Sequence, residues 1–324
     1  MSNATVNQAG GAKGFTLSSL GDYAPTYGAL AALVLLFVLN SLFTPNFFDA
    51  NNFRNILLQV SPTVLVAIGM TFVMATGGID LSVGAVMAIA SAVAATSLDR
   101  GTGVAVALAV AVALAAGTFN GALISFFRIQ PIIVTLALLI AGRGVAQVIN
   151  GGQIIPFSDP SFEFFGKGSI GPVPVQVLVM FVAVAAAVFV MRATAFGRYV
   201  LAVGGNEAAA RLAGVKVART KVAVYALSGL LAGIAGVVET ARQGASDAPN
   251  IGLNIELDAI AATVVGGTPL TGGRATVVGT LIGALIMQII TVSFNMNNVS
   301  YAWSLVVKAA IIIVAVYIQR PKVA

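Results

Sequence analysis

The chain has 324 residues, of which 58% are hydrophobic and 9% are charged, with a formal net charge of +6 and a mean hydropathy of +0.98. Soluble domains carry roughly 25% charged residues, so this composition predicts a helical bundle embedded in a lipid bilayer. The sequence contains neither histidine nor cysteine. That absence excludes Cys/His zinc sites, thiolate-held iron–sulfur clusters, His-ligated haem, and Ser-His-Asp or Cys-His catalysis.

Residues 1–24 are small and polar and lack the regions of a signal peptide, so we interpret them as a cytoplasmic tail. Apolar segments follow, most of them near the ~20 residues that cross a ~30 Å hydrocarbon core. Two of them, 81–98 and 257–270, are short and interrupted by Gly, which is typical of partial or re-entrant helices. The pattern predicts one all-α polytopic domain over residues 25–320 with about ten spans, within a range of eight to ten. The ten segments are 25–44, 56–76, 81–98, 102–126, 131–149, 173–191, 221–240, 257–270, 275–294 and 301–318.

The distribution of positive charge predicts the orientation of these spans. With ten spans and a cytoplasmic N-terminus, 11 of the 17 Lys and Arg residues fall on the inner side, 4 fall outside, and Arg143 and Lys308 lie within spans. Inner loops of membrane proteins are enriched in Lys and Arg. Both termini are therefore expected in the cytoplasm, and the basic character of the chain needs no nucleic acid partner to explain it.

Two loops are long enough to carry function, and small residues mark where spans meet. The outer loop 150–172 is rich in Gly, Pro and Phe, and we expect it to form a small cap. The inner loop 192–220 is the only large cytoplasmic segment and holds 5 of the 11 inner cations. Two Gly-x3-Gly pairs, Gly229/Gly233 and Gly279/Gly283, predict close helix packing.

The inner loop contains the pattern of a short, capped helix. A pair of glycines is expected to break the chain after the apolar run 199–203, and Asn206 is then placed to cap the sequence EAAARLAG. An acidic first turn suits the helix dipole, and a glycine supplies the stop. The alanines leave one face nearly bare, which suits docking into a groove of another protein, while a helix lying on the membrane is the alternative. The residues of this element are Gly204, Gly205, Asn206, Glu207, Ala208, Ala209, Ala210, Arg211 and Gly214.

The stretch AVGGNEAAARLAGVKVARTKVAVYALSGLLAGIAG, residues 202–236, resembles the coupling-helix region of ABC-importer permeases. More narrowly it is similar to the ribose/xylose/galactofuranose group of monosaccharide permeases. The same resemblance extends to MTFVMATGGIDLSVGAVMAIASA (Met70 to Ala92), to Ile129–Gln153 and to Glu256–Ala284, and in all to about residues 25–320. The segments AGRGVAQ and FSDPSFEFFG are closest to permeases for galactofuranose-like sugars.

The resemblance implies a type II ABC-importer-like bundle in the bacterial inner membrane. It implies a permease subunit that pairs with a second copy or a paralogue and with two cytoplasmic ABC ATPases, and that receives its sugar from a periplasmic binding protein. The 206–214 helix would couple the chain to the ATPase. The sequence has no GxxxxGK[ST] phosphate loop, so the chain is expected to be no enzyme and to bind no cofactor or metal, ATP and Mg being held by the partner.

A turn between two spans is the second candidate element. This turn is expected at the inner face of the membrane, where Asp80 is placed to cap the next helix; its residues are Gly77, Gly78, Asp80 and Ser82. The functional alternative is a gate or ATPase contact whose bonds are made and broken during transport. A similar string, Gly266 to Gly273, makes Gly266 and Gly267 candidates for the same role and weakly suggests an internal repeat.

Ionisable residues inside a membrane are functional candidates by default. Arg143 lies between two glycines and is expected either to bond to carbonyl groups or a carboxylate or to line the sugar path. Lys308 is expected to snorkel to the headgroups or to line the same path. Neutral sugars need hydrogen-bonding side chains, so the wall candidates are Asn120, Gln147, Gln243 and Asn295.

Charges on the outer side are candidates for docking a binding protein by charge complementarity. Solvated loop charges or helix caps are the alternative, and Asp258 in particular has the position of a cap. The docking candidates are Arg54, Asp159, Glu163, Arg242 and Glu256.

Two other functions compete with an ATP-driven sugar permease. An ion-coupled secondary transporter needs ionisable groups near mid-membrane, but every carboxylate here falls at or near a span end. The other is an ABC permease for another cargo, such as branched-chain amino acids or an autoinducer. Selectivity for a particular sugar is expected to lie mainly in the binding protein.

Overall fold

The computed structural model describes residues 17–319, and side chains over 26–317. This part of the chain forms thirteen α-helices, one short 3-10 helix and four two-residue strands. The first helices are α1 (Leu17–Phe43), α2 (Ala50–Ala75), α3 (Val83–Thr96), η1 (Leu98–Arg100), α4 (Thr102–Phe126), α5 (Pro131–Ile149), α6 (Pro160–Lys167) and α7 (Val175–Ala193). The others are α8 (Ala195–Gly205), α9 (Glu207–Leu212), α10 (Val217–Gln243), α11 (Ile255–Val265), α12 (Val277–Met296) and α13 (Tyr301–Gln319). The strands are β1 (Ile155–Pro156), β2 (Ser169–Ile170), β3 (Val173–Pro174) and β4 (Ala245–Ser246), and β1 pairs with β4 and β2 with β3, both antiparallel.

A helix lies at each of the ten apolar segments that the sequence predicts. Among the described residues, seven helices are long and apolar enough to cross a membrane. The helices α3 and α11 have only 14 and 11 residues, as the glycine interruptions predicted. Helix α1 begins at Leu17, so residues 17–24 of the expected tail are helical, and residues 1–16 lie outside the described part.

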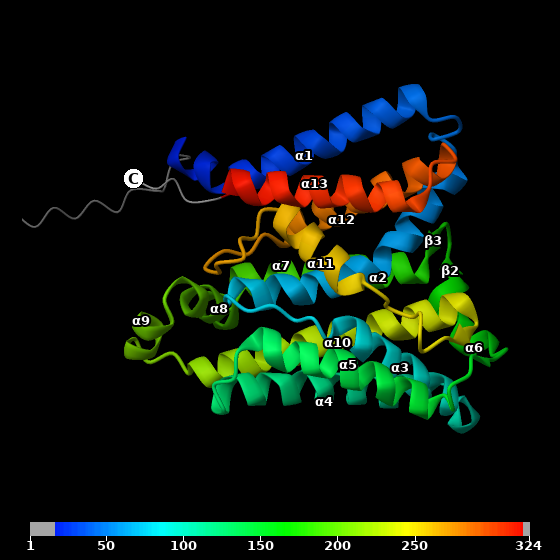
Figure 1. Cartoon of the computed structure of the whole chain (residues 1–324), viewed down its shortest axis with the longest axis horizontal. Helices are drawn as coiled ribbons and strands as arrows, with labels where there is room; N and C mark the ends of the chain where they lie inside the picture. The colour runs from blue at the N-terminus through cyan, green and yellow to red at the C-terminus, as the bar shows by residue number, and fades with distance from the viewer. Residues whose placement is uncertain (1–16, 320–324) are drawn as a thin grey trace, which may run out of the picture.

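The long helices run side by side along the long axis of the molecule (Figure 1). Helices α2 and α10 lie at the centre of the bundle. In their most apolar stretches 78% and 61% of the residues are buried inside the protein, against 22% in α4 and in α5. Helix α10 packs against α2, α3 and α4, while α1 and α13 pack on α12 at the other edge of the bundle.

Both predicted Gly-x3-Gly pairs lie where two helices approach each other closely. A Cβ added to Gly229 would lie 2.4 Å from the carbonyl oxygen of Ala113 in α4, and one added to Gly279 would lie 1.9 Å from that of Gly266. Backbones can approach so closely only where no side chain intervenes, so these glycines fix the α4–α10 contact and the contact of α12 with the end of α11.

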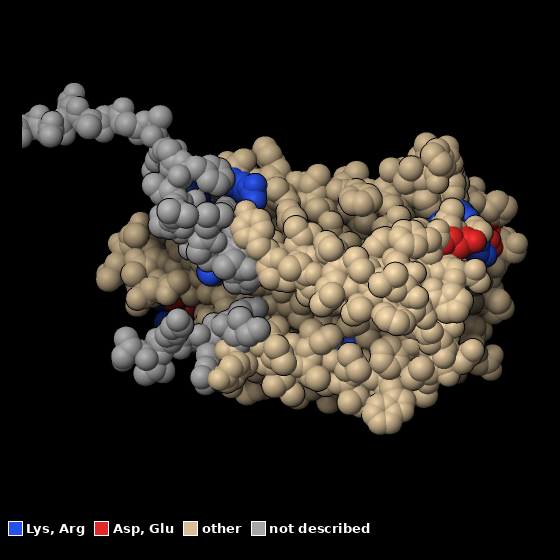
Figure 2. All heavy atoms as spheres, turned by 90° about the horizontal axis from the view of Figure 1, so that it is seen from above, with Lys and Arg blue, Asp and Glu red and all other residues tan. Residues whose placement is uncertain are grey.

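The two long loops lie at opposite ends of the bundle, as the predicted topology requires (Figure 1). Figure 2 shows charged side chains near the two ends of one face, with few between them. The loop 150–172 is folded as the predicted cap: α6 buries Phe162, whose ring meets that of Phe157 edge-on at 5.3 Å between centroids.

Candidate functional site

The predicted docking helix, α9, is preceded by another helix, α8, which the sequence analysis did not predict. Gly204 and Gly205 do not break the chain after Val203, because α8 continues through both and ends at Gly205. The break comes at Asn206, whose extended backbone (φ −160°, ψ 103°) separates α8 from α9. The predicted position of the break was therefore wrong by two residues.

The predicted capping of α9 is confirmed, whereas Ala210, expected on the bare face with Ala208 and Ala209, is buried. The side chain of Asn206 accepts a hydrogen bond of 2.9 Å from the backbone N–H of Ala209, and Gly214 follows the helix with a φ of +83°, which favours glycine. Ala208 and Ala209 are exposed and Leu212 is 91% exposed, while Ala210 is buried. The helix therefore presents a small apolar surface to its surroundings and is anchored through its opposite side.

Glu207 ties α9 to the N-terminal part of α10. Its carboxylate accepts a hydrogen bond of 2.6 Å from Lys221 Nζ and one of 3.0 Å from Arg211 Nη2. The hydrogen bond from Lys221 is the main reason that the pKa of Glu207 lies below its usual value. The side chain of Glu207 is 43% exposed, so water screens these pairs and each contributes less than ~1 kcal/mol.

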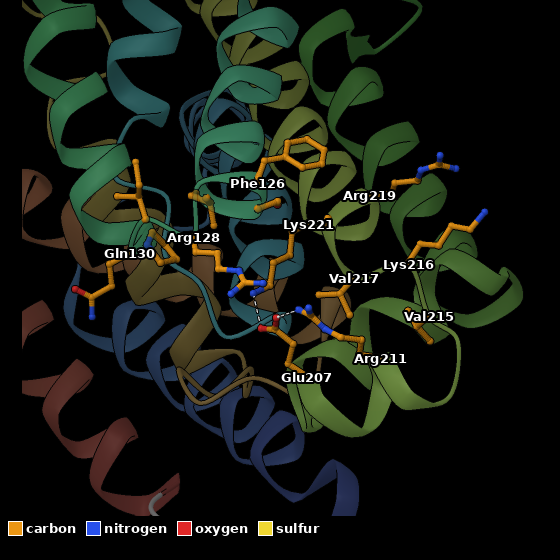
Figure 3. A pocket seen from close by; sticks show the side chains of 15 residues that line it. Phe126, Arg128, Gln130, Glu207, Arg211, Val215, Lys216, Val217, Arg219 and Lys221 are labelled. Atoms are coloured by element: carbon orange, nitrogen blue, oxygen red, sulfur yellow. Dashed lines mark hydrogen bonds and ion pairs between the residues drawn. The ribbon is translucent and has the colours of Figure 1, made fainter.

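A cavity of about 930 Å³ opens beside α9, between the α4–α5 turn and the start of α10 (Figure 3). Among the described residues that line it, Glu207 is the one acid. Figure 3 shows the carboxylate of Glu207 between Arg211 and Lys221, while the side chains of Lys216 and Arg219 extend away from it. The cations that line the cavity are Arg128, Arg211, Lys216, Arg219 and Lys221. This end of the bundle is therefore strongly positive and suits an acidic partner surface.

The turn between α2 and α3 is held by a buried network. Asp80 is 1% exposed, and its Oδ1 accepts bonds from the N–H and the hydroxyl of Ser82 at 3.0 and 2.6 Å. Its Oδ2 accepts a bond of 2.8 Å from the hydroxyl of Ser228 in α10, and Asn120 Nδ2 in α4 donates to Ser82 Oγ at 2.9 Å. Helix α3 begins at Val83, and its N-cap is Ser82 rather than Asp80. Asp80 thus accepts one backbone amide at the start of α3, that of the N-cap Ser82, and in addition joins the turn to α10.

The two candidate intramembrane cations are both bonded inside the protein. Arg143 Nη1 donates to the carbonyl of Ala248 at 3.0 Å and to that of Ile251, and its Nη2 is 3.4 Å from the carbonyl of Gly252. It therefore makes the predicted carbonyl contacts and holds the loop before α11. Lys308 does not snorkel, because its ammonium group lies 3.0 Å from the carboxylate of Asp258.

Asp258 and Glu256 differ from their predicted surroundings because α11 begins at Ile255. Asp258 is therefore the fourth residue of the helix and no cap. Glu256 is buried and close enough to Arg143 for their charges to interact. A buried carboxylate has no access to a docking partner, so Glu256 is removed from the set of outer docking residues.

The remaining path candidates do not form one group. Asn120 is fully buried beside Ser82, whereas Gln147 in α5 is only partly buried. Gln243 is exposed at the end of α10, where it donates to Glu239, and Asn295 is exposed near the end of α12. Of these four side chains, Asn120 is the one with a described hydrogen bond to another predicted residue, Ser82.

The other outer charges lie in or beside the cap, and their contacts favour local roles. Asp159 caps α6 by accepting from the N–H groups of Ser161 and Phe162. Glu163 pairs with Lys167 at 2.8 Å and Arg242 pairs with Glu239, while Arg54 Nη2 lies 3.4 Å from Ser169 Oγ. The cap reading of Asp159 is therefore confirmed. The docking role stays a prediction for Arg54, Asp159, Glu163 and Arg242.

The two glycine turns make contacts with residues that the sequence pattern did not indicate. Gly77 has the positive φ (+78°) that its turn requires, and Gly266 packs against the backbone of α12. Gly267 is buried beside it. Gly272 and Gly273, in the same loop, meet the end of α2, and Ser228 bonds to Asp80. A lone serine beside Gly229 inside an apolar span was the available signal for Ser228.

The long apolar helices form a bundle, its charged loops lie at the two ends, and a short exposed helix lies at one of these ends. This arrangement defines a multi-pass, all-α membrane protein of the permease type. Residues 52–316 match the family described as the branched-chain amino acid transport system/permease component. The chain belongs to this family of ABC-importer permeases and is a protein of the bacterial inner membrane.

Relatives with assigned substrates cover almost the whole chain. The ribose import permease protein RbsC of Escherichia coli K12 is 41% identical over 300 residues, which are 91% of this chain and 93% of that protein. The galactofuranose transporter permease protein YtfT of the same organism is also 41% identical, over 90% of this chain and 89% of its own length. The L-arabinose permease protein AraH of Azospirillum brasilense is 36% identical over 90% and 87%. No solved structure gives a significant match.

Proposed function

We propose that the chain is the transmembrane permease subunit of an ATP-driven monosaccharide importer and that α9 docks on its cytoplasmic ATPase. The observation that carries the docking assignment is the exposed, capped α9, with Ala208, Ala209 and Leu212 outward and Ala210 anchored. A face of small side chains fits closely into a groove, and the positive cavity beside it suits an acidic partner. The names of the relatives support the sugar cargo.

In this proposal the working transporter contains two permease subunits, either two copies of this chain or one copy with a paralogue, and two ABC ATPase domains. ATP and Mg²⁺ are bound by the ATPase, and no cofactor or metal by this chain. A periplasmic sugar-binding protein docks at the opposite end, near the cap that contains α6. ATP drives transport because it binds the inward- and outward-open states with different affinity.

Uptake by reconstituted transporter tests this proposal. Proteoliposomes containing this chain, the ATPase and the binding protein should accumulate labelled sugar only with ATP, and an uncoupler should leave the uptake unchanged. Ala209→Asp places a charge on the exposed face of α9 and should abolish ATP-driven uptake. The matched control Ala202→Asp, on the exposed side of α8, should retain it. Uptake that survives without ATP but stops with an uncoupler would show an ion-coupled transporter instead.

The description of the matching family favours a second cargo, branched-chain amino acids. A competition series separates the two cargoes. Ribose, L-arabinose or galactofuranose should displace the labelled sugar from the binding protein of this system, and leucine should not. Displacement by leucine but by none of the sugars would assign the amino-acid cargo.

A further inference from the structure

Three backbone segments from distant parts of the sequence meet at the end of α8. The N–H of Gly273, in the loop after α11, donates to the carbonyl oxygen of Ala75 at the end of α2 at 3.0 Å. A Cβ added to Gly204 would lie 1.8 Å from that same carbonyl oxygen and 2.6 Å from the nitrogen of Gly273. A Cβ on Gly272 would lie 2.8 Å from the nitrogen of Gly77. Helix α8 therefore touches the end of α2 and the turn 266–273 directly through backbone, and the turn 266–273 in turn touches Gly77.

Helix α8 is also joined firmly to α9 and to α2. Val203 of α8, Ala210 of α9 and Val217 of α10 form one small buried cluster. At the other end of α8, the ring of Phe196 stacks on that of Phe72 in α2, with centroids 6.3 Å apart and planes 23° from parallel. Asn206 is the single residue between α8 and α9. A displacement of α9 therefore reaches α8 through packed side chains, without a flexible linker.

The two glycines at the end of α8 have different surroundings. Gly204 is partly buried against Ala75, while Gly205 is exposed and a Cβ there would meet nothing within 4 Å. Both residues are helical, and neither has a positive φ. The demand for glycine at Gly204 is therefore steric and comes from the close approach of α8 to α2.

We propose that Gly204 is a positioning residue through which α8 carries a displacement of α9 to the glycine turns 77–78 and 266–273. This inference rests on the proposed docking of α9 on the ATPase. Close-packed backbone contacts transmit displacement because they lack side chains that can change rotamer to absorb it. The turn at 77–78 in turn leads to Asp80 and the start of α3. One lever of α8 and α9 thereby reaches α3 and α11, the helices that adjoin these two turns.

Two glycine-to-alanine substitutions test the lever in the assembled transporter. Gly204→Ala must move α8 away from α2 by roughly 1 Å, because a backbone oxygen has no rotamer with which to give way. Uptake of sugar and hydrolysis of ATP are measured in the same proteoliposomes. The sugar transported per ATP should fall by roughly tenfold in Gly204→Ala, with cross-linking of Ala209→Cys to the ATPase retained. The control is Gly103→Ala, at the exposed start of α4, where an added Cβ meets nothing within 4 Å, and it should leave both quantities unchanged.

Equal ratios of transport to hydrolysis in the two variants would overturn the lever and leave the docking of α9 intact. Loss of the Ala209→Cys cross-link in the otherwise unchanged transporter would instead refute the docking itself. The two failures are therefore distinguishable.

A second measurement does not require Gly204→Ala to fold. Spin labels are placed on cysteines at Ala213, Leu270 and Gln130, all exposed, in pairs and in transporters diluted with unlabelled chain. The distance between the labels at positions 213 and 270 should stay constant between the nucleotide-free and ATP-bound states. The distances from each of these two labels to the label at position 130 should change together. A change in 213–130 with a constant 270–130 distance would show that α9 moves without the turn, which contradicts the lever.

Discussion

The hydroxyl of Ser228 in α10 donates a hydrogen bond of 2.8 Å to Oδ2 of Asp80, and both side chains are buried. This hydrogen bond joins the Asp80 carboxylate to α10. Ser228→Ala removes this contact and little else, because the two bonds from Ser82 to Asp80 remain. A Cβ on Gly69 would lie 2.9 Å from the Cα of Ser228. This tight surrounding makes alanine, the smaller residue, the suitable replacement.

The expected cost follows from the partner being an acidic group. A hydrogen bond to a charged group contributes about 1.5–3 kcal/mol when it is buried. Ser228→Ala should therefore lower the free energy of unfolding by about 1.5–3 kcal/mol and the Tm by a few degrees. Ser41→Ala is the matched control, because the hydroxyl of Ser41 bonds within its own helix to the carbonyl of Phe37. It should change stability by less than ~0.5 kcal/mol.

The assay is thermal unfolding of the purified chain in detergent micelles for the wild type, Ser228→Ala, Asp80→Ala and the double variant. Residues in direct contact show interaction energies of about 0.5–3 kcal/mol in such a cycle. We expect the double variant to lose less stability than the sum of the single variants. Strictly additive losses would refute the Asp80–Ser228 contact and with it the attachment of the α2–α3 turn to α10.

Three further outcomes are expected. Lys308→Met should destabilise the protein by about 1–3 kcal/mol, because it leaves the half-buried carboxylate of Asp258 without its cation. Adding Asp258→Asn should restore most of this stability, and no rescue in thermal unfolding would contradict the pair. Arg143→Met should speed proteolysis and amide exchange in 247–254, because it removes the donors to three carbonyls there; unchanged exchange would count against this anchor. The folded pKa of Glu207 lies below 4.5, so its stabilisation is complete above that pH and is lost as the pH falls through the folded pKa. The Tm difference between wild type and Glu207→Gln should therefore shrink below about pH 4.5, and a difference that grows there would reverse the assigned sign.

The sequence was sufficient where the determining interactions are local. The apolar segments locate every long helix, because burial in lipid depends on composition over about 20 residues. The cap of α9 could be predicted because Asn206, Glu207 and Gly214 lie within one short stretch. The short lengths of α3 and α11 followed from glycines that are adjacent in the sequence.

The failures concern contacts between residues far apart in the chain. Gly204 was expected to break a helix, but it is glycine because of Ala75, which lies in a different span. Asp80 was expected to cap a helix, but it also bonds to Ser228 on another helix, and Lys308 was expected to reach the headgroups, but it pairs with Asp258 on another helix. Spacing along one helix does not reveal a partner on a different one. Patterning gives the exposed or buried side of each helix, but it does not fix which helices are neighbours.

The coupling assignment is tested most directly by a cross-link, which the absence of cysteine from the chain makes simple. Ala209→Cys on α9 is paired with a single cysteine in the groove of the ATPase, and Gln153→Cys, exposed in the loop at the opposite end, serves as the control. The account predicts that Ala209→Cys cross-links with a yield that changes on ATP binding and that Gln153→Cys does not cross-link. A transport-active complex in which Ala209→Cys gives no cross-link in any nucleotide state would contradict it.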